Sequence, residues 1–181
     1  MLFRSTKKSH KAFWSLLFCL FASEVYAQQS CDSAIPQFSK AIYEDHGDGT
    51  ITEKHSKLTW MRCAVGQIWQ NSVCKNEPNA LTWTEAKRIA ESINEGQVYF
   101  YNDWHMPSLK EIAMITDMQC KSPRINLIVF PGTPAASFWT SSTKLVEGPE
   151  LKAFAMHFGD GGLVLASLEN THYVRFVRKA D

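Results

Sequence analysis

Two helix starts of the same kind lie in the middle of the chain and constrain its fold more than any other feature. Thr82 and Glu85 have the spacing of a capping box, and Ser108 and Glu111 repeat that spacing. In a capping box each side chain bonds the backbone N–H of the other residue, so the box fixes where a helix begins. The sequence therefore predicts one helix after Thr82 and a second one after Ser108.

The residues after each start extend these two predictions. Apolar residues follow the first start at the spacing of one helix face; they are Trp83, Ala86, Ile89, Ala90 and Ile93. Gly96 is expected to end this helix. The second helix is expected to continue until the chain reaches Cys120, with one side formed by Leu109, Ile112, Ala113 and Thr116.

Strand signals dominate the remaining sequence. Residues 43–63 combine turn residues with β-branched residues, and Gly159-Asp-Gly-Gly162 is a tight-turn signal between two apolar segments, which predicts a hairpin. Further strands are expected at 137–142 and 173–178. Helices in the first half and antiparallel strands in the second half predict an α+β domain in which the helices pack on a sheet.

The N-terminal residues have the pattern of a secretory signal. A positively charged stretch precedes the short apolar segment 12–22, and Val25 and Ala27 fit the −3 and −1 positions of a cleavage site. The predicted divisions are a signal peptide at 1–27, an N-terminal arm at 28–42 and one domain at 43–181. Cleavage would place the mature protein in the periplasm of a Gram-negative bacterium or outside the cell. The alternative is an uncleaved membrane anchor.

Cleavage also changes the charge of the chain. The signal holds four of the 19 Lys and Arg residues and one of the 18 Asp and Glu residues, which leaves 15 against 17 and a net charge of −2. Nucleic acids bind to clustered basic surfaces, so neither a nucleic-acid partner nor an anionic membrane surface is predicted. After cleavage no apolar segment is long enough to span a membrane.

The cysteines that remain predict a disulfide framework. Cleavage removes Cys19 and leaves four cysteines, an even number that indicates disulfides in an exported chain. Of the three possible pairings we favour Cys63–Cys74, which closes a short polar loop, with Cys31–Cys120, which ties the arm to the domain. No CxxC pair or HxxxH cluster accompanies them, so neither a metal site nor a cofactor is predicted.

Several motifs occur in order along the chain: GDGTITEKHSKLTWMRCAVGQIW, LTWTEAKRIAESIN, DWHMPSLKEI, FPGTPAASFWTSS, and FAMHFGDGGLV followed by YVRFVR. Together they resemble the DUF1566 family, also described as the C-terminal domain of Legionella collagen-like proteins, over roughly residues 43–178. The family is similar in fold to C-type lectins and to formylglycine-generating, sulfatase-modifying domains. The resemblance implies two helices on a twisted antiparallel sheet, which two disulfides would staple here. It implies no activity, because this kind of fold carries both binders and enzymes.

The chain departs from the family pattern at two places. The family usually has Asp-Trp-Arg-Leu-Pro where this chain has Asp103-Trp-His-Met-Pro107. A histidine would make any salt bridge of that arginine weaker and dependent on pH. We expect Asp103 and His105 to form a local polar pair that steadies the helix start, and not a catalytic dyad. Lys57 replaces the glycine of a common Thr-Gly pair, which puts a tight turn there in doubt.

No catalytic or metal-binding pattern emerges from the polar residues. The segment 44–55 resembles a calcium loop, but His55 occupies the position of the required bidentate glutamate, so a turn before a strand explains it better. Glu77-Pro-Asn79 matches a lectin motif but precedes both helices instead of following them. Ser141 and Ser142 lack the glycines of a nucleophile elbow, and the histidines are scattered. We therefore predict no catalytic residue.

The tryptophans leave one candidate for ligand binding. Trp60, Trp83, Trp104 and Trp139 are expected in the core, whereas Trp69 lies in the polar disulfide loop. Trp69 is either an exposed stacking platform or a lid over the core. We expect an exported, non-catalytic domain that binds a glycan or an envelope or surface protein through disulfide-held loops. The alternatives are an enzyme of the sulfatase-modifying fold, which would need two free reactive thiols, and a structural subunit of an envelope or pilus assembly.

Overall fold

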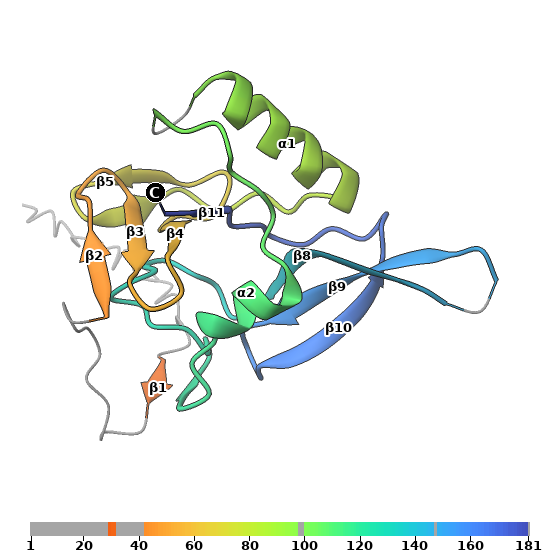
Figure 1. Cartoon of the computed structure of the whole chain (residues 1–181). Helices are drawn as coiled ribbons and strands as arrows, with labels where there is room; N and C mark the ends of the chain where they lie inside the picture. Colours follow the sequence, from red (N-terminus) through yellow and green to blue (C-terminus); the bar gives the residue numbers. More distant parts are fainter. Residues whose placement is uncertain (1–28, 32–41, 98–99, 147, 181) are drawn as a thin grey trace, which may run out of the picture.

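The computed structural model describes residues 29–31, 42–97, 100–146 and 148–180 (Figure 1). The predicted signal peptide at 1–27 and most of the predicted arm therefore lie outside the described residues. Within the described part of the chain, none of the helices has the length and apolar character needed to cross a membrane.

A four-stranded antiparallel sheet forms one half of the domain (Figure 1). Its strands lie in the order β11-β4-β3-β2, and they are β2 (Tyr43–Asp45), β3 (Thr50–Glu53), β4 (Leu58–Met61) and β11 (Val177–Lys179). The tight turn between β3 and β4 is present although Lys57 stands where glycine is usual, because Lys57 adopts the left-handed conformation with φ of 59°. The doubt about this turn was therefore wrong.

A three-stranded antiparallel sheet forms the other half. It has the order β10-β9-β8 and consists of β8 (Ser137–Leu145), β9 (Leu151–His157) and β10 (Gly162–Ser167). Gly161 lies in the turn between β9 and β10 with φ of 76°, a conformation that glycine adopts without strain. The hairpin predicted around this turn is confirmed. The far end of the β8–β9 hairpin extends away from the rest of the domain, and β10 is the outer strand (Figure 1).

The two predicted helices are present, and both begin at their capping boxes. Helix α1 is Trp83–Glu95 and helix α2 is Leu109–Met114. Gly96 ends α1 as expected. Helix α2 is shorter than predicted, because the next turn of the chain bonds elsewhere: the Asp117 N–H donates to the Arg124 carbonyl at 2.9 Å. The helix therefore ends at Met114, before the chain reaches Cys120.

The strand predicted at 173–178 is also shorter than expected, since only its end belongs to β11. Earlier in this segment, the Tyr173 N–H donates to the Ser137 carbonyl of β8, and the Phe176 carbonyl accepts from the Met61 N–H of β4. The segment thus passes from one large sheet to the other and joins them. A local sequence pattern gives no information on which neighbour a strand residue pairs with, which is why this change of partner was missed.

Two short antiparallel pairs complete the described structure. β1 (Ser30–Cys31) pairs with β7 (Cys120–Lys121), and β5 (Ile68–Gln70) pairs with β6 (Val73–Lys75). The loop closed by Cys63 and Cys74 therefore contains a hairpin that its polar sequence did not indicate.

The helices cover opposite faces of the three-stranded sheet. Successive strand residues point to opposite faces; Ala155 of β9 packs in the cluster that contains Ala86 and Ala90 of α1, whereas Met156 packs in the cluster that contains Ile112 of α2. Trp60, Trp104 and Trp139 are fully buried, as predicted. The described structure is a mixed α and β domain with two helices and several antiparallel sheets, instead of the one sheet expected.

Candidate ligand-binding site

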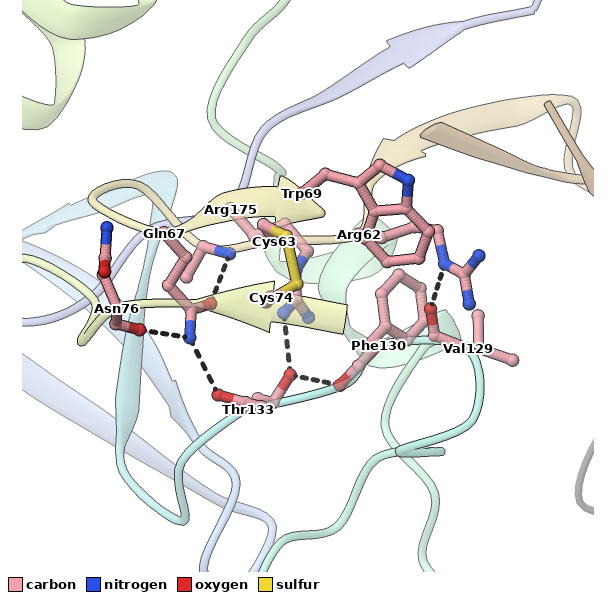
Figure 2. The surroundings of a disulfide bond; sticks show 12 residues. Arg62, Cys63, Gln67, Trp69, Cys74, Asn76, Val129, Phe130, Thr133 and Arg175 are labelled. Atoms are coloured by element: carbon pink, nitrogen blue, oxygen red, sulfur yellow. Dashed lines mark hydrogen bonds between the residues drawn. A yellow bond between two sulfur atoms is a disulfide. The ribbon is translucent and has the colours of Figure 1, made fainter. Parts of the chain in front are cut away.

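The four cysteines of the described residues form the pairs Cys31–Cys120 and Cys63–Cys74, which is the pairing favoured from the sequence. The second disulfide joins the end of β4 to the hairpin β5–β6, which we call the disulfide hairpin (residues 68–75; Figure 2). Gln67 fastens its base, because the Gln67 side-chain amide donates to the carbonyls of Asn76 and Gly132 at 3.3 and 3.2 Å. These contacts hold the hairpin against the segment that follows Phe130.

Trp69 points toward the body of the domain. Trp69 is the cross-strand partner of Cys74, so both side chains lie on the same face of the hairpin, and Cys74 is bonded inward to Cys63. The Trp69 indole N–H donates to the Gly47 carbonyl at 3.2 Å. A Cβ atom at Gly49 would lie only 2.8 Å from the Trp69 ring. The ring is thus partly buried against the turn between β2 and β3.

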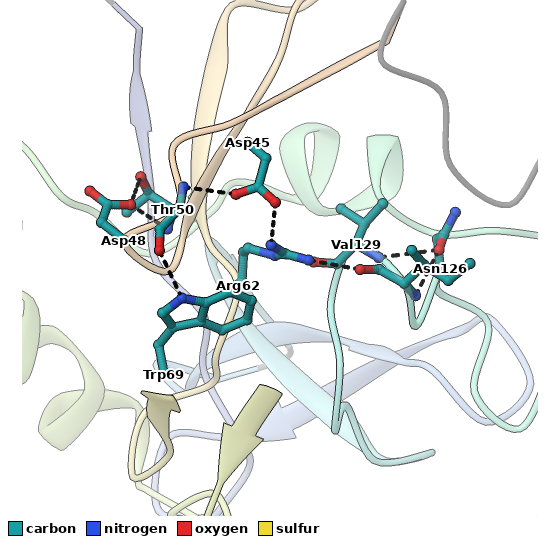
Figure 3. A network of polar contacts seen from close by, with 9 residues as sticks. Asp45, Asp48, Thr50, Arg62, Trp69, Asn126 and Val129 are labelled. Carbon is teal, nitrogen blue, oxygen red and sulfur yellow. Dashed lines mark hydrogen bonds and ion pairs between the residues drawn. The ribbon is translucent and has the colours of Figure 1, made fainter. Parts of the chain in front are cut away.

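Arg62 forms the base on which the Trp69 ring rests (Figure 3). Its guanidinium carbon lies 4.3 Å from the ring centroid, and its nitrogens donate to the Asp45 carboxylate at 2.7 Å and to the carbonyls of Ile128 and Val129 at 2.8 Å. Burial lowers the pKa of Arg62 and the Asp45 carboxylate acts in the opposite direction. The cation–π contact fixes one face of Trp69.

The outer face of the disulfide hairpin carries the residues that the sequence analysis missed. Ile68 and Val73 point away from Trp69 and are 60% and 38% exposed. The signal that could have found them is the two-residue period of a strand: once Cys74 bonds inward, residues next to Trp69 and Cys74 must point outward.

A buried cation lies beneath the disulfide hairpin (Figure 2). The Arg175 side chain is 1% exposed, donates to the Thr133 hydroxyl at 2.7 Å and lies 4.6 Å from the centroid of the Phe130 ring. Its Nε and Nη1 atoms have no hydrogen-bond partner among the described residues. Burial lowers the pKa of Arg175 to about 9, so the group is still charged at neutral pH.

A concave site lies along α1. This α1 pocket has a volume of about 320 Å³ and is lined by Trp83, Lys87, Ala90, Glu91, Asn94, Trp104, His105, Met106 and Ser141. Its size falls within the range of small-molecule sites, in which a mostly apolar wall carries a few polar groups that orient the ligand. Helix α1 supplies one wall, and the segment that leads to α2 supplies the other.

Trp83 is the aromatic residue of this pocket that is partly exposed. It is the first residue of α1, and its indole N–H donates to the Thr140 carbonyl at 2.9 Å, so the edge of the ring is fixed to β8. The Lys87 ammonium lies 5.0 Å from the ring centroid. Trp83 was assigned to the core from its helical spacing, and the structure places it at the border between the core and the pocket.

The opposite wall is fixed by Asn94. The Asn94 side-chain amide donates to the Trp104 carbonyl at 2.9 Å and accepts from the Trp104 N–H at 2.8 Å. This two-way bond fastens the extended segment to the helix, although the segment itself forms neither a helix nor a strand. The His105 N–H and carbonyl bond Val177 of β11, so the wall is anchored on both of its sides.

Asp103 and His105 do not pair with each other through their side chains, contrary to the sequence prediction. Asp103 accepts from Arg178 at 2.6 Å, whereas the His105 Nε2 atom lies 3.3 Å from the Glu111 carboxylate. Toward Asp103, the His105 ring contacts the backbone carbonyl, at 3.3 Å. The backbone of this segment is extended, so each side chain finds a partner from a different element.

The contact with His105 adds to the capping box of α2. Burial opposes the charge of Glu111, but hydrogen bonds from Ser108 and from His105 outweigh it and hold the pKa of Glu111 below its ordinary value. His105 therefore does steady the helix start, as predicted, but through Glu111.

The other histidines are dispersed over the domain. His46 bonds the Thr52 hydroxyl at 2.8 Å, and His157 bonds Asp160 at 3.0 Å. His172 packs against Trp139, and burial, followed by the charge of His157, lowers the pKa of His172. No three His, Cys, Asp or Glu side chains within the described ranges are grouped so that they could hold a metal ion.

The comparison with known proteins gives one family. The family model described as the Lcl C-terminal domain matches residues 49–178, a span that includes the disulfide hairpin, the α1 pocket and the whole three-stranded sheet. No curated protein matches the chain.

Proposed function

The chain belongs to the Lcl C-terminal domain family, and on that premise we propose that it is an exported, non-catalytic domain that binds a glycan in the α1 pocket. The observation that carries this proposal is the partly exposed Trp83, which lines the pocket together with polar side chains from three different elements. A sugar ring has C–H groups on its faces and hydroxyls on its rim. Such a ring would stack on Trp83 and bond the surrounding groups with its hydroxyls.

The charges around the pocket favour a neutral ligand. Lys87 and Glu91 lie one helix turn apart on α1 and balance each other, and Ser141 adds a hydroxyl. Each can donate to or accept from a sugar hydroxyl. The side chains of Trp83 and Asn94 are already ordered by hydrogen bonds. Binding of a ligand would therefore cost less conformational entropy.

The state of the cysteines supports binding over the enzymatic alternative. An enzyme of the sulfatase-modifying kind needs free reactive thiols, whereas Cys31, Cys63, Cys74 and Cys120 are all bonded in pairs. Disulfides persist in oxidising compartments, which supports a location in the periplasm or outside the cell. We also propose, on the resemblance in sequence, that the architecture is related to that of C-type lectins.

A glycan array with the full chain, expressed so that the cell can process its N-terminus, tests the proposal. Lys87→Ala should weaken binding of any glycan found by about 5- to 10-fold, the loss expected for one or two hydrogen bonds. Arg88→Ala is the matched control, since Arg88 is the exposed next residue of α1 and does not line the pocket. Equal binding by wild type and Lys87→Ala, or absence of any bound glycan, would refute the proposal.

A second candidate function is contact with an envelope or surface protein through the disulfide hairpin. It is favoured by the exposed apolar side chains of Ile68 and Val73 on a hairpin that a disulfide holds rigid. An envelope pull-down with wild type, Ile68→Lys and Trp69→Ala separates the contributions. If only Ile68→Lys loses a partner, the outer face of the disulfide hairpin makes the contact. If only Trp69→Ala loses it, Trp69 makes the contact. Retention with both variants excludes this surface.

A further inference from the structure

The strand β10 has an open edge that lacks the usual protection. β10 is the outer strand of the three-stranded sheet (Figure 1). Beyond the ladder with β9, the described residues give the backbone of 163–166 no hydrogen-bond partner. Its sequence, Gly-Leu-Val-Leu-Ala-Ser, contains no charged residue and no proline. Proteins normally protect such edges with charges, prolines or bulges, because an unprotected edge pairs with another strand.

The other outer strands of the two large sheets differ from β10. At the edge of the four-stranded sheet, β2 carries Glu44 and Asp45. The outer side of β8 is covered, because the Trp139 N–H donates to Tyr173 and the Ser141 N–H donates to Pro107. At the remaining edge, β11 bonds His105 in both directions. Within the described chain, β10 alone among these four edges is both uncovered and uncharged.

The side chains around this edge form an apolar surface on the α2 face of the sheet. Leu163 and Leu165 are 54% and 38% exposed, and they share a face with their cross-strand partners Met156 and Phe154. Met118 extends the surface, since it is exposed and its sulfur would lie 3.0 Å from a Cβ atom at Gly161, in the turn before β10. Exposed apolar surface next to an open strand edge indicates a partner that covers both.

We propose that this edge is a self-association site, at which β10 pairs antiparallel with β10 of a second copy across a two-fold axis. The sequence Leu163-Val164-Leu165 is the same in both directions. With Val164 on the axis, each Leu163 lies opposite Leu165 of the second copy, so two leucine pairs form on one face and a valine pair on the other. An isologous contact requires a surface that matches itself in this way.

The charges near the strand permit this register. Asp160, four residues before Val164, lies opposite Leu168 of the second copy in this register. Glu169 lies opposite Gly159 of the second copy. No like charges are therefore placed opposite each other. A foreign strand would also find an open edge here, but only a second copy makes use of the symmetric leucines.

Sedimentation velocity over a range of concentrations tests the proposal with the full chain, processed by the cell. Wild type is expected to associate, and Leu165→Lys, which adds a charge to the edge, should weaken the association by about tenfold or more. Leu145→Lys is the matched control, because Leu145 is the same residue type, exposed and in a strand, but lies on the β8–β9 hairpin. A monomeric wild type, or equal association by wild type and Leu165→Lys, would overturn the proposal.

Cysteine variants test the register without adding a charge. In the proposed pairing Leu163 faces Leu165, so an oxidised mixture of Leu163→Cys and Leu165→Cys should give covalent dimers. Each variant alone should give far fewer covalent dimers. In this register the two copies of residue 163 are displaced from each other by two residues along the strands, and so are the two copies of residue 165. Equal cross-linking in the mixture and in the separate variants would show that the strands do not pair in this register.

Discussion

The guanidinium of Arg178 lies 2.6 Å from the carboxylate of Asp103 (Nε to Oδ1) and joins the last strand to the segment that leads into α2. The two residues are 75 positions apart in the sequence. The Arg178 side chain is 6% exposed and the Asp103 side chain is 46% exposed, and the guanidinium also lies 3.8 Å from the centroid of the Tyr101 ring. One arginine thus fixes both residues that flank Asn102.

Replacement of Asp103 by alanine should destabilise the domain. The change leaves the buried Arg178 guanidinium without its carboxylate, and the loss of a hydrogen bond between charged groups costs about 1–3 kcal/mol. Urea unfolding at neutral pH measures the difference. Glu77→Ala is the control, since Glu77 is exposed in a loop. A free energy of unfolding equal to that of wild type would mean that Arg178 is held without Asp103.

The change His105→Arg should leave the stability equal or raise it slightly. Arginine would place a permanent charge near Glu111, where His105 is charged only when protonated. The pair is partly exposed, so the gain is expected to be about 0–1 kcal/mol. Thermal unfolding of this variant beside His55→Arg, which adds the same charge at an exposed turn, gives the comparison. A clear loss in His105→Arg alone would assign the histidine a role of its own.

The start of α2 should make the stability depend on pH in the acid range. Hydrogen bonds from Ser108 and His105 outweigh the effect of burial and hold the pKa of Glu111 below its ordinary value of 4.5. The ionised form therefore stabilises the folded state. This contribution is fully present above the unfolded pKa, near 4.5, and is lost as the pH falls through the lower folded value.

The variant Glu111→Gln isolates that contribution, because glutamine can accept the same hydrogen bonds but does not titrate. Urea midpoints measured from about pH 6 down to pH 3 should fall less steeply in Glu111→Gln than in wild type. The pKa values of Glu53, Glu85 and Asp160 are also lowered, but they affect both proteins and cancel in the comparison. Parallel curves for the two proteins would contradict the prediction.

Replacement of Arg175 by methionine should leave the stability at neutral pH unchanged or raise it. Arg175 is a buried charge without a carboxylate partner among the described residues, held by Thr133 and the Phe130 ring. Well-packed apolar residues often replace buried charged groups with a gain of about 1–4 kcal/mol. Arg175→Ala, which leaves a cavity, should instead lose stability. Urea unfolding compares the three proteins, and a large loss in Arg175→Met would show that the charge is needed.

Features that depend on neighbouring residues were predictable from the sequence, whereas the backbone pairings that end or join elements were not. Both capping boxes and the β9–β10 turn rest on interactions within a few residues, so their sequence patterns were sufficient. The shortened α2 depends on a bond from Asp117 to Arg124, outside the spacing of a helix, and the change of sheets after Tyr173 depends on a distant partner, Ser137. Short-range patterns do not contain this information.

The candidate site shows the same division. The sequence singled out Trp69 because its neighbours are polar, but the orientation of its ring follows from its pairing with Cys74 and from the position of Arg62. The α1 pocket was not predicted, because Lys87 and Ser141 are 54 positions apart and each resembles an ordinary surface residue. Only the packing of α1 beside the extended segment at Trp104 brings them to one cavity.

The residue pattern is enough to show where the helices begin, which segments form the β9–β10 hairpin and to which family the chain belongs, because these follow from local hydrogen bonding and from motif order. Packing in three dimensions sets which residue Asp103 pairs with, which face of the disulfide hairpin is exposed and which strand edge remains open. These properties depend on contacts between residues far apart in the chain, and such contacts exist only after the sheets and helices have packed together.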